Sequence, residues 1–68
     1  MRTWWYIVFH WYEVQAPDGF TRLEWAVNEN EARRQAAKIP GYEPEDALQV
    51  QERPDLPPKH PPRRYRYA

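Results

Sequence analysis

The sequence of 68 residues contains no cysteine and no serine, and it has only two histidines and two glycines. Without cysteine there is neither a disulfide nor a thiolate metal site. Without serine or cysteine, no nucleophile of either type can be assembled, and two glycines are too few to build a glycine-rich loop around phosphate. We therefore expect a protein that is not an enzyme and that uses neither a cofactor nor a metal ion.

Long apolar runs are also absent. None approaches the roughly 20 residues needed to cross a bilayer, and residues 1–15 lack the charged and aliphatic regions of a signal peptide. We expect a cytoplasmic protein without membrane contact. The formal net charge is zero, but residues 1–52 carry five basic and nine acidic side chains, whereas residues 53–68 carry five basic and one acidic. The sequence thus predicts an acidic body with a basic end.

Aromatic residues are abundant and concentrate in residues 3–14, which a second apolar stretch, residues 20–27, follows. The residues between these stretches have turn chemistry. Pro17 suits the first corner of a type I turn, and Gly19 can take the positive φ of a bulge. The pattern therefore predicts a β-hairpin. Its register places Trp11 opposite Trp25, Phe9 opposite Val27 and Glu13 opposite Leu23.

The predicted register decides which residues share a side of the hairpin, because side chains alternate along a strand. One side carries large apolar residues and is expected to form the core: Trp5, Ile7, Phe9, Trp11, Leu23, Trp25 and Val27. The other side mixes aromatic, apolar and charged residues: Trp4, Tyr6, Val8, His10, Tyr12, Val14, Arg22, Glu24 and Ala26. An exposed patch of this second kind either receives a later segment of the chain or contacts another molecule.

A helix is predicted over residues 28–39. Asn28 is suited to cap it, and Glu31, three residues later, is placed to complete a capping box. Small side chains recur on one narrow face at Ala32 and Ala36, which would let the helix approach the sheet closely. We expect the tryptophans to fill the space that these alanines leave.

Residues 47–52 alternate in the manner of a third strand, with Leu48 and Val50 facing inward. The predicted order is β-β-α-β, and the crossover through the helix is expected to lay the third strand parallel to the first. The expected fold class is α+β, with a three-stranded sheet packed on one helix. Residues 1–53 would form this domain, and residues 54–68, which hold five of the eight prolines, a proline-rich basic tail.

The tail supports two hypotheses about ligands. Its end interleaves guanidinium and aromatic groups, which suits phosphate neutralisation with base stacking, at Arg63, Arg64, Tyr65 and Arg66. The alternative is that these residues form a solvated, disordered end that binds no ligand. Residues 58–63 also match the proline-and-arginine spacing of ligands for aromatic-lined grooves. The tail is further expected to lie back on the open aromatic face of the hairpin, because proline rings and tyrosines stack on tryptophan and tyrosine.

The body supports a third hypothesis. A compact acidic surface with aromatic anchors can occupy a positively charged channel that normally receives nucleic acid. The competing interpretation is an ordinary acidic surface. If the surface binds a partner, we expect the contacts to come from Glu24, Tyr6, His10, Tyr12 and Trp4.

The layout resembles that of the small inhibitor of host RNA polymerase carried by lytic podophages of the coliphage type. The shared features are an aromatic strand, a hairpin, a Glu- and Ala-rich helix, a Pro/Gly connection and a last strand that ends in Arg-Pro, here residues 5–8, 20–27, 28–37, 39–42 and 48–54. The resemblance implies contact with the polymerase jaw and blocked promoter opening. It places Arg53 at one partner-binding arginine, whereas Gln51 stands where the family has the other, and the basic end after Pro58 also departs from the family.

Our leading hypothesis is therefore a monomeric, phage-encoded protein that acts in the host cytoplasm. It would bind and inhibit a host macromolecular machine, bacterial RNA polymerase being the first choice. Three alternatives stay open: a nucleic-acid-binding module that uses the tail, an inhibitor of a host defence nuclease, and an accessory component of a virion.

Overall fold

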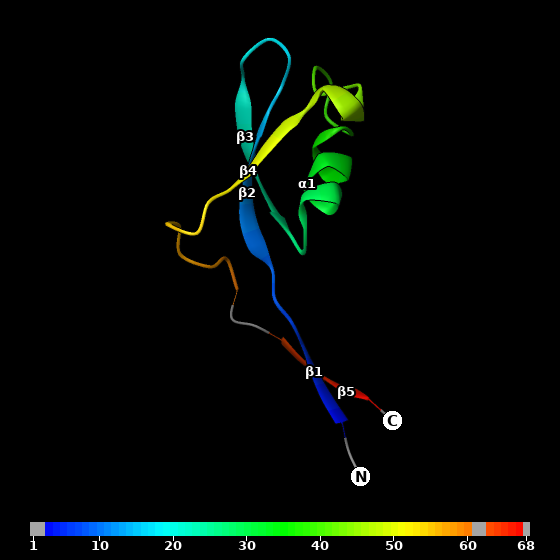
Figure 1. The fold of residues 1–68 in the computed structure, drawn as a ribbon, viewed down its shortest axis with the longest axis vertical. Helices are drawn as coiled ribbons and strands as arrows, with labels where there is room; N and C mark the ends of the chain where they lie inside the picture. The colour runs from blue at the N-terminus through cyan, green and yellow to red at the C-terminus, as the bar shows by residue number, and fades with distance from the viewer. Residues whose placement is uncertain (1–2, 61–62, 68) are drawn as a thin grey trace.

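A computed structural model describes the backbone of residues 3–60 and 63–67 and the side chains of residues 8–60. Its elements run in the order β1 (Thr3–Ile7), β2 (His10–Gln15), β3 (Thr21–Ala26), α1 (Glu29–Ala36), the 3-10 turn η1 (Glu45–Ala47), β4 (Gln49–Glu52) and β5 (Arg63–Tyr67). One antiparallel sheet has the strand order β3-β2-β4, and a separate two-stranded ribbon joins β1 to β5. Helix α1 covers one side of the three-stranded sheet (Figure 1). The predicted α+β class and β-β-α-β order of the body are confirmed.

The hairpin turn forms as its residues predict. The amide of Ala16 donates to the carbonyl of Phe20 at 2.8 Å, and the amide of Gly19 donates to the carbonyl of Ala16 at 2.9 Å. Gly19 has a φ of +95°, a region that side chains with a Cβ rarely adopt. This geometry sets the register, and Trp11 lies opposite Trp25 and Glu13 opposite Leu23, as expected.

The long first strand breaks at Val8 and Phe9, so that β1 and β2 belong to different sheets. The predicted pair of Phe9 with Val27 is wrong, because β3 ends at Ala26. The reason is the start of the helix. After Ala26 the chain leaves the sheet so that Asn28 can cap α1, and the pairing of β2 with β3 therefore stops at His10 and Ala26.

Helix α1 begins where the capping residue predicts. Asn28 is extended, and its side-chain oxygen accepts a hydrogen bond from the amide of Glu31 at 2.9 Å. The carboxylate of Glu31 is bound by Arg34, one turn further on. The helix ends at Ala36, three residues earlier than the expected end at position 39.

Strand β4 pairs antiparallel with β2, so the expectation that the third strand runs parallel to the first is wrong. The crossover through α1 instead joins β3 to β4, which flank β2 and run in the same direction as each other. Leu48 and Val50 do face inward, as predicted. Leu48 is buried, and Val50 packs against the core with its partner Val14.

The core lies on the side of the sheet opposite to the one that the sequence predicted. The buried cluster consists of Tyr12, Val14, Ala26, Ala32, Ala36 and Leu48. Ala32 and Ala36 are fully buried and bring α1 close to β2 and β3, which leaves room for a valine and a tyrosine but not for two indoles. Trp11 and Trp25 therefore stand on the far face of the sheet, away from α1.

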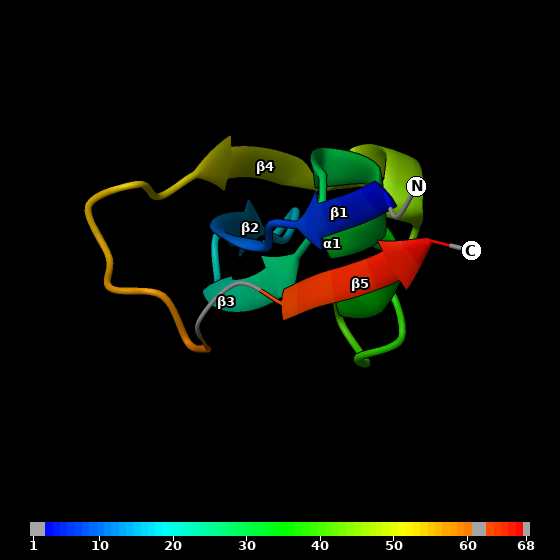
Figure 2. The same cartoon turned by 90° about the horizontal axis from the view of Figure 1, so that it is seen from below.

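The segment after β4 returns to this far face. Residues 53–60, which we call the strap, cross it on the side opposite to α1 (Figures 1 and 2). Beyond the strap, β5 pairs antiparallel with β1, within the segment that the sequence analysis described as a proline-rich basic tail. The expectation that the proline-rich segment lies back on the open aromatic face is wrong for the strap, which instead lies on the face of Trp11 and Trp25 that the sequence analysis assigned to the core.

The buried cluster gives a direct test of the core assignment. We expect Leu48→Ala to lower the free energy of unfolding by about 2–5 kcal/mol, because it removes a buried side chain and leaves a cavity. The matched change Leu23→Ala removes the same atoms from a side chain that is 42% exposed, so the loss should stay below about 1 kcal/mol. Urea unfolding followed by circular dichroism measures both. Equal losses would contradict the placement of the core.

Candidate functional site

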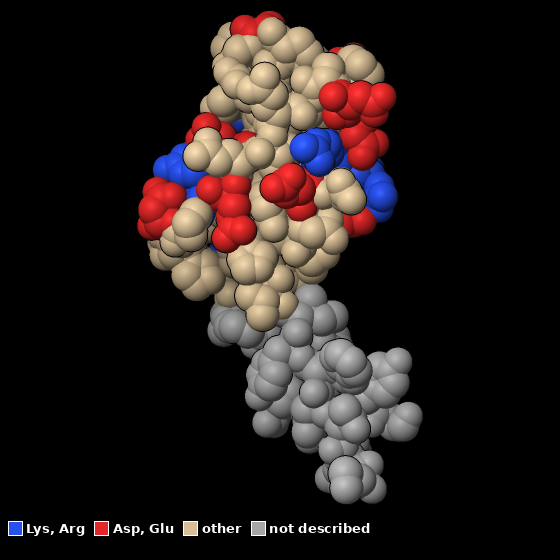
Figure 3. Space-filling model, viewed as in Figure 1, with Lys and Arg blue, Asp and Glu red and all other residues tan. Residues whose placement is uncertain are grey.

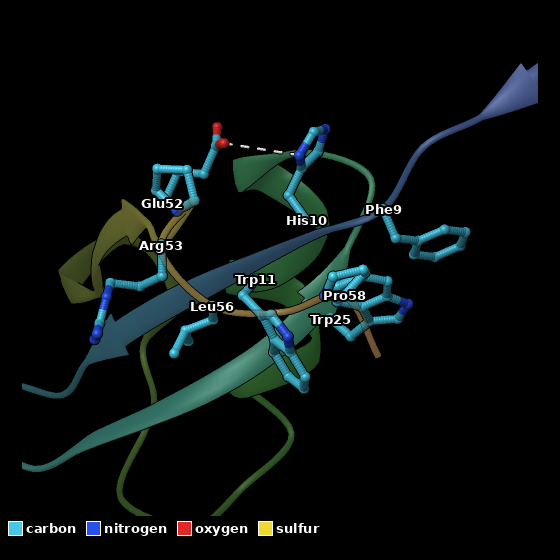
Figure 4. Close-up of a pocket in the computed structure, with 9 residues that line it drawn as sticks. Phe9, His10, Trp11, Trp25, Glu52, Arg53, Leu56 and Pro58 are labelled. Atoms are coloured by element: carbon cyan, nitrogen blue, oxygen red, sulfur yellow. Dashed lines mark ion pairs between the residues drawn. The ribbon is translucent and has the colours of Figure 1, made fainter. Parts of the chain in front are cut away.

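The strongest candidate site is a groove between the far face of the sheet and the strap. It has a volume of about 210 Å³ and is lined by Phe9, His10, Trp11, Trp25, Glu52, Arg53, Pro54, Leu56 and Pro58. Figure 4 shows the two tryptophans, Leu56 and Pro58 on one side of β2, and His10 and Glu52 on the other. We call this site the aromatic groove. Its volume is below the roughly 300–1,000 Å³ of sites for drug-sized ligands, so it suits a side chain of a polypeptide better than a whole small molecule.

Three aromatic rings form a row along the groove. The rings of Phe9 and Trp25 are stacked, with centroids 6.0 Å apart and planes at 11°, and the rings of Trp25 and Trp11 are 5.0 Å apart at 59°. The register of the hairpin sets this row, since Trp11 and Trp25 are directly opposite each other. His60 approaches Trp25 edge-on at 6.5 Å. A row of this kind offers flat apolar faces, against which the ring of another side chain can pack.

The strap is held to the groove at two points. At its start, the amide of Arg53 donates to the carbonyl of Trp11 at 2.8 Å, which extends the ladder between β4 and β2 by one residue. In its middle, the indole Nε1–H of Trp11 donates to the carbonyl of Pro57 at 2.7 Å. Proline-rich backbone makes few internal hydrogen bonds, so its carbonyls are free to accept from an indole.

Arg53 fastens the start of the strap with its side chain as well. Its guanidinium donates to Glu13 at 2.6 Å and to both carboxylate oxygens of Asp55 at 2.9 and 3.0 Å. The hydrogen bonds that Arg53 donates to Asp55 and Glu13 raise the pKa of Arg53, and the hydrogen bond from Arg53 lowers the pKa of Asp55 below its ordinary value. Arg53 thus ties the strap both to β2 and to its own first turn.

A second feature is the charge at the hairpin end of the sheet. Glu43, Glu45 and Asp46 precede β4, whose first residue Gln49 pairs with Gln15 beside the turn that carries Asp18. Among the described side chains, these four carboxylates, which we call the acidic end, are in none of the ion pairs. Figure 3 shows carboxylates at the hairpin tip and on the side that carries η1. Phe20, 71% exposed, lies next to the same turn.

One predicted contact residue, Tyr12, is not at a surface. Its side chain is 5% exposed and belongs to the core under α1, so the prediction that it binds a partner is wrong. The face that carries it is covered because the helix packs there. Burial, followed by the charges of Glu52 and Glu29, raises the pKa of the Tyr12 phenol.

The other described candidates lie apart from one another. Glu24 is mostly covered and accepts a hydrogen bond from Arg22 at 2.7 Å, and Arg22 in turn lies over the ring of Tyr42. His10 is half-exposed, 3.7 Å from Glu52, at the rim of the aromatic groove. Arg53 also lines the groove, and its guanidinium donates to Glu13 and Asp55 of the chain itself. The structure thus brings His10 and Arg53 together and leaves Glu24 elsewhere.

The remaining candidates belong to the ribbon of β1 and β5, and their side chains lie outside the described ones. The backbone register places Trp4 opposite Arg66, Tyr6 opposite Arg64 and Trp5 opposite Tyr65. Pairing of the two ends of the chain thus gathers the residues of two separate predictions, the aromatic strand and the basic tail, into one element.

The sequence analysis missed the groove residues Phe9, Trp11 and Trp25 as site residues because it placed them in the core. The available signal was the indole N–H, which needs an acceptor when it is covered, together with a proline-rich segment able to supply one. The narrow alanine face of α1 was the second signal, since it approaches the sheet too closely for indoles.

Other classes of site find little support in the described part of the chain. Among residues 8–60 there is no group of three or more side chains placed to hold a metal ion. No helix within the described residues is long and apolar enough to cross a bilayer. No protein-family model, no curated protein and no solved structure matches the chain.

The ion pair at the start of the strap predicts a pH response. The pKa of Asp55 is lowered from 3.8 when folded, so its pairing stabilises the strap above pH 3.8 and is lost as the pH falls through the folded pKa. We expect the indole resonance of Trp11 to report this loss in an acid titration by NMR. In the Arg53→Ala protein the pKa of Asp55 should return towards 3.8. An unchanged carboxyl titration in that variant would show that Arg53 does not hold Asp55.

Proposed function

We propose that the protein is a non-enzymatic binding protein that attaches to a positively charged surface of a host macromolecular machine and inhibits it. The observation that carries the proposal is the acidic end. Its four carboxylates lie towards the hairpin end of the sheet and are in none of the ion pairs among the described side chains, whereas most other carboxylates of the described body have a basic partner. Unpaired charge of one sign steers a molecule towards a basic channel.

The described body as a whole has the same sign of charge. Residues 8–60 contain ten acidic and six basic side chains, a net charge of −4. Phe20 stands exposed beside the turn that carries Asp18 and supplies an apolar anchor at the hairpin end. Complementary charge mostly sets the association rate, and a buried aromatic anchor supplies affinity, so the two together suit a partner-binding surface.

Bacterial RNA polymerase is the first partner to test. The support is the likeness in layout to the podophage inhibitors, with a hairpin, a capped helix and a strand, β4, that ends at Glu52 directly before Arg53-Pro54. In this proposal the protein is phage-encoded, acts as a monomer in the host cytoplasm, and places its acidic end in the DNA channel. A host defence nuclease, whose cleft is also basic, is the other machine of the same kind.

Affinity capture tests the proposal. The tagged full-length protein is incubated with bacterial lysate at low salt, and bound proteins are identified by mass spectrometry. We expect polymerase subunits, and we expect excess protein to block promoter opening in transcription in vitro. Recovery of no polymerase subunit together with unchanged transcription would exclude RNA polymerase as the partner. Recovery of a nuclease would identify the nuclease as the partner instead.

Replacing carboxylates by amides distinguishes the effect of charge at the acidic end from the effect of the net charge of the protein. We expect Glu45→Gln with Asp46→Asn to slow association with the captured machine at least about tenfold at low salt, because the steering charge is removed. The matched protein Glu29→Gln with Glu31→Gln has the same net charge but loses carboxylates that Arg33 and Arg34 already neutralise. Equal slowing in both proteins would show that the location of the charge is irrelevant.

A nucleic-acid-binding module is the second candidate, favoured by the register of the ribbon. Pairing of β1 with β5 sets Trp4 and Tyr6 opposite Arg66 and Arg64, so stacking and phosphate-neutralising residue types alternate along one element. We expect this function to show as binding to single-stranded DNA or RNA that weakens steeply between 50 and 200 mM salt, as about three phosphate contacts require. Arg64→Gln with Arg66→Gln should flatten the salt slope by about 2. Absence of binding at the lowest salt would remove the candidate.

A further inference from the structure

We propose that the aromatic groove is a recognition site for extended proline-rich peptides, and that the strap is an intramolecular ligand which a proline-rich segment of another protein displaces. The chain contains both halves of one recognition mode. Trp11, Trp25 and Phe9 form the aromatic surface, and residues 53–63 hold consecutive prolines with basic residues. The strap shows which ligand the surface accepts.

The hydrogen bond from Trp11 is the first reason. Proline-rich ligands present carbonyls that no amide of their own backbone satisfies, and a tryptophan on an aromatic surface fixes them by donating its indole N–H. Here the indole of Trp11 donates to the carbonyl of Pro57 at 2.7 Å, and Pro57 is followed directly by Pro58, which lines the groove. The bond is made to backbone, so it selects for backbone geometry and tolerates many side chains.

The row of rings is the second reason. Proline is a rigid ring that loses little conformational entropy on binding, and it packs against flat aromatic faces. The stacked Phe9 and Trp25 and the neighbouring Trp11 provide such faces in sequence along β2 and β3. Pro58 and Leu56 lie on the same side of β2 as the two indoles (Figure 4).

The strap leaves part of the surface accessible, which is the third reason. About 210 Å³ remains open between the strap and the sheet, and Pro54, Leu56 and Pro58 border it from the strap. Within the strap, the chain is fastened to the sheet by Arg53 at one end and by the bond from Trp11 further on. Among the side chains of residues 8–60, a competing segment therefore has an entry point and one hydrogen bond to replace beyond Arg53.

The composition of the bound segment favours a basic ligand. The strap contains Lys59, and Arg63 follows three residues beyond its end. The partner is therefore expected to be a protein segment with consecutive prolines and flanking lysine or arginine, such as the strap sequence itself. This site lies on the far face of the sheet and does not depend on the acidic end, so either proposal can fail alone.

A peptide with the sequence of residues 53–63 tests the proposal in an NMR titration of the full-length, isotope-labelled protein. We expect the indole resonances of Trp11 and Trp25 to shift with this peptide. They should not shift with a matched peptide in which Pro57 and Pro58 are replaced by alanine. The same shifts with both peptides, or none with either up to about 1 mM, would overturn the proposal, because a tethered strap competes at about that effective concentration.

Weakening the intramolecular ligand provides the sharper arm. In a protein with Pro57→Ala and Pro58→Ala the tethered competitor is poorer, so the unaltered peptide should bind at least about tenfold more tightly than to the original protein. Adding Trp11→Phe to that protein should abolish the gain, and adding Leu23→Ala should leave it. Dispersed amide spectra confirm that each variant is folded, which the separate core under α1 favours.

Self-association is a distinct outcome of the same experiment. If the Trp11 resonance moves with protein concentration alone, and sedimentation shows a dimer, the occupant is the strap of a second copy, which would overturn displacement by another protein. A monomer with peptide-dependent shifts supports the proposal. Tighter binding in the proline variant that Trp11→Phe does not abolish would place the peptide elsewhere.

Discussion

The close approach of α1 to the sheet is the contact on which the rest of the structure depends. Ala32 and Ala36 are fully buried against a face that carries Tyr12, Val14 and Ala26. Two alanines allow a short distance between helix and sheet, and that distance fixes the volume available beneath them. The choice of inner face follows from this volume, because a valine and a tyrosine fit and a pair of indoles does not. Trp11 and Trp25 therefore lie on the opposite face of the sheet.

Once the indoles lie outside the core, the chain has to cover them with something else. Within residues 3–60 and 63–67 the one α-helix, α1, lies on the other face of the sheet, and bare indoles would expose a large apolar surface. The strap covers part of that surface at low cost, since its prolines lose little entropy on ordering and Pro57 offers a free carbonyl to Trp11. The same contacts that stabilise the fold thus define a surface with a preference for proline-rich backbone.

The elements could be predicted because they depend on neighbouring residues. The features that were predicted wrongly depend on contacts between residues far apart in the sequence. The turn at Pro17 and Gly19 gave the register correctly, and Asn28 marked the start of the helix, because both depend on a few neighbouring residues. The inner face was predicted wrongly because side-chain size was taken as the criterion, whereas the helix's narrow alanine face was the limiting dimension. The break at Val8 and the pairing of β1 with β5 depend on where the neighbouring strands end, and a local sequence pattern does not indicate this.

The distribution of charge follows from the same geometry and separates two binding chemistries. Arg53, Arg33 and Arg34 each neutralise carboxylates of their own neighbourhood, so the unpaired charge of the described body is left near η1 and the hairpin turn. The aromatic groove, by contrast, is lined by Glu52, which lies 3.7 Å from His10, and by Arg53, which binds Glu13 and Asp55. Electrostatic attraction therefore acts at one end of the sheet and apolar recognition on its far face. A partner that uses the acidic end leaves the groove free, and a partner in the groove must first compete with the chain's own strap.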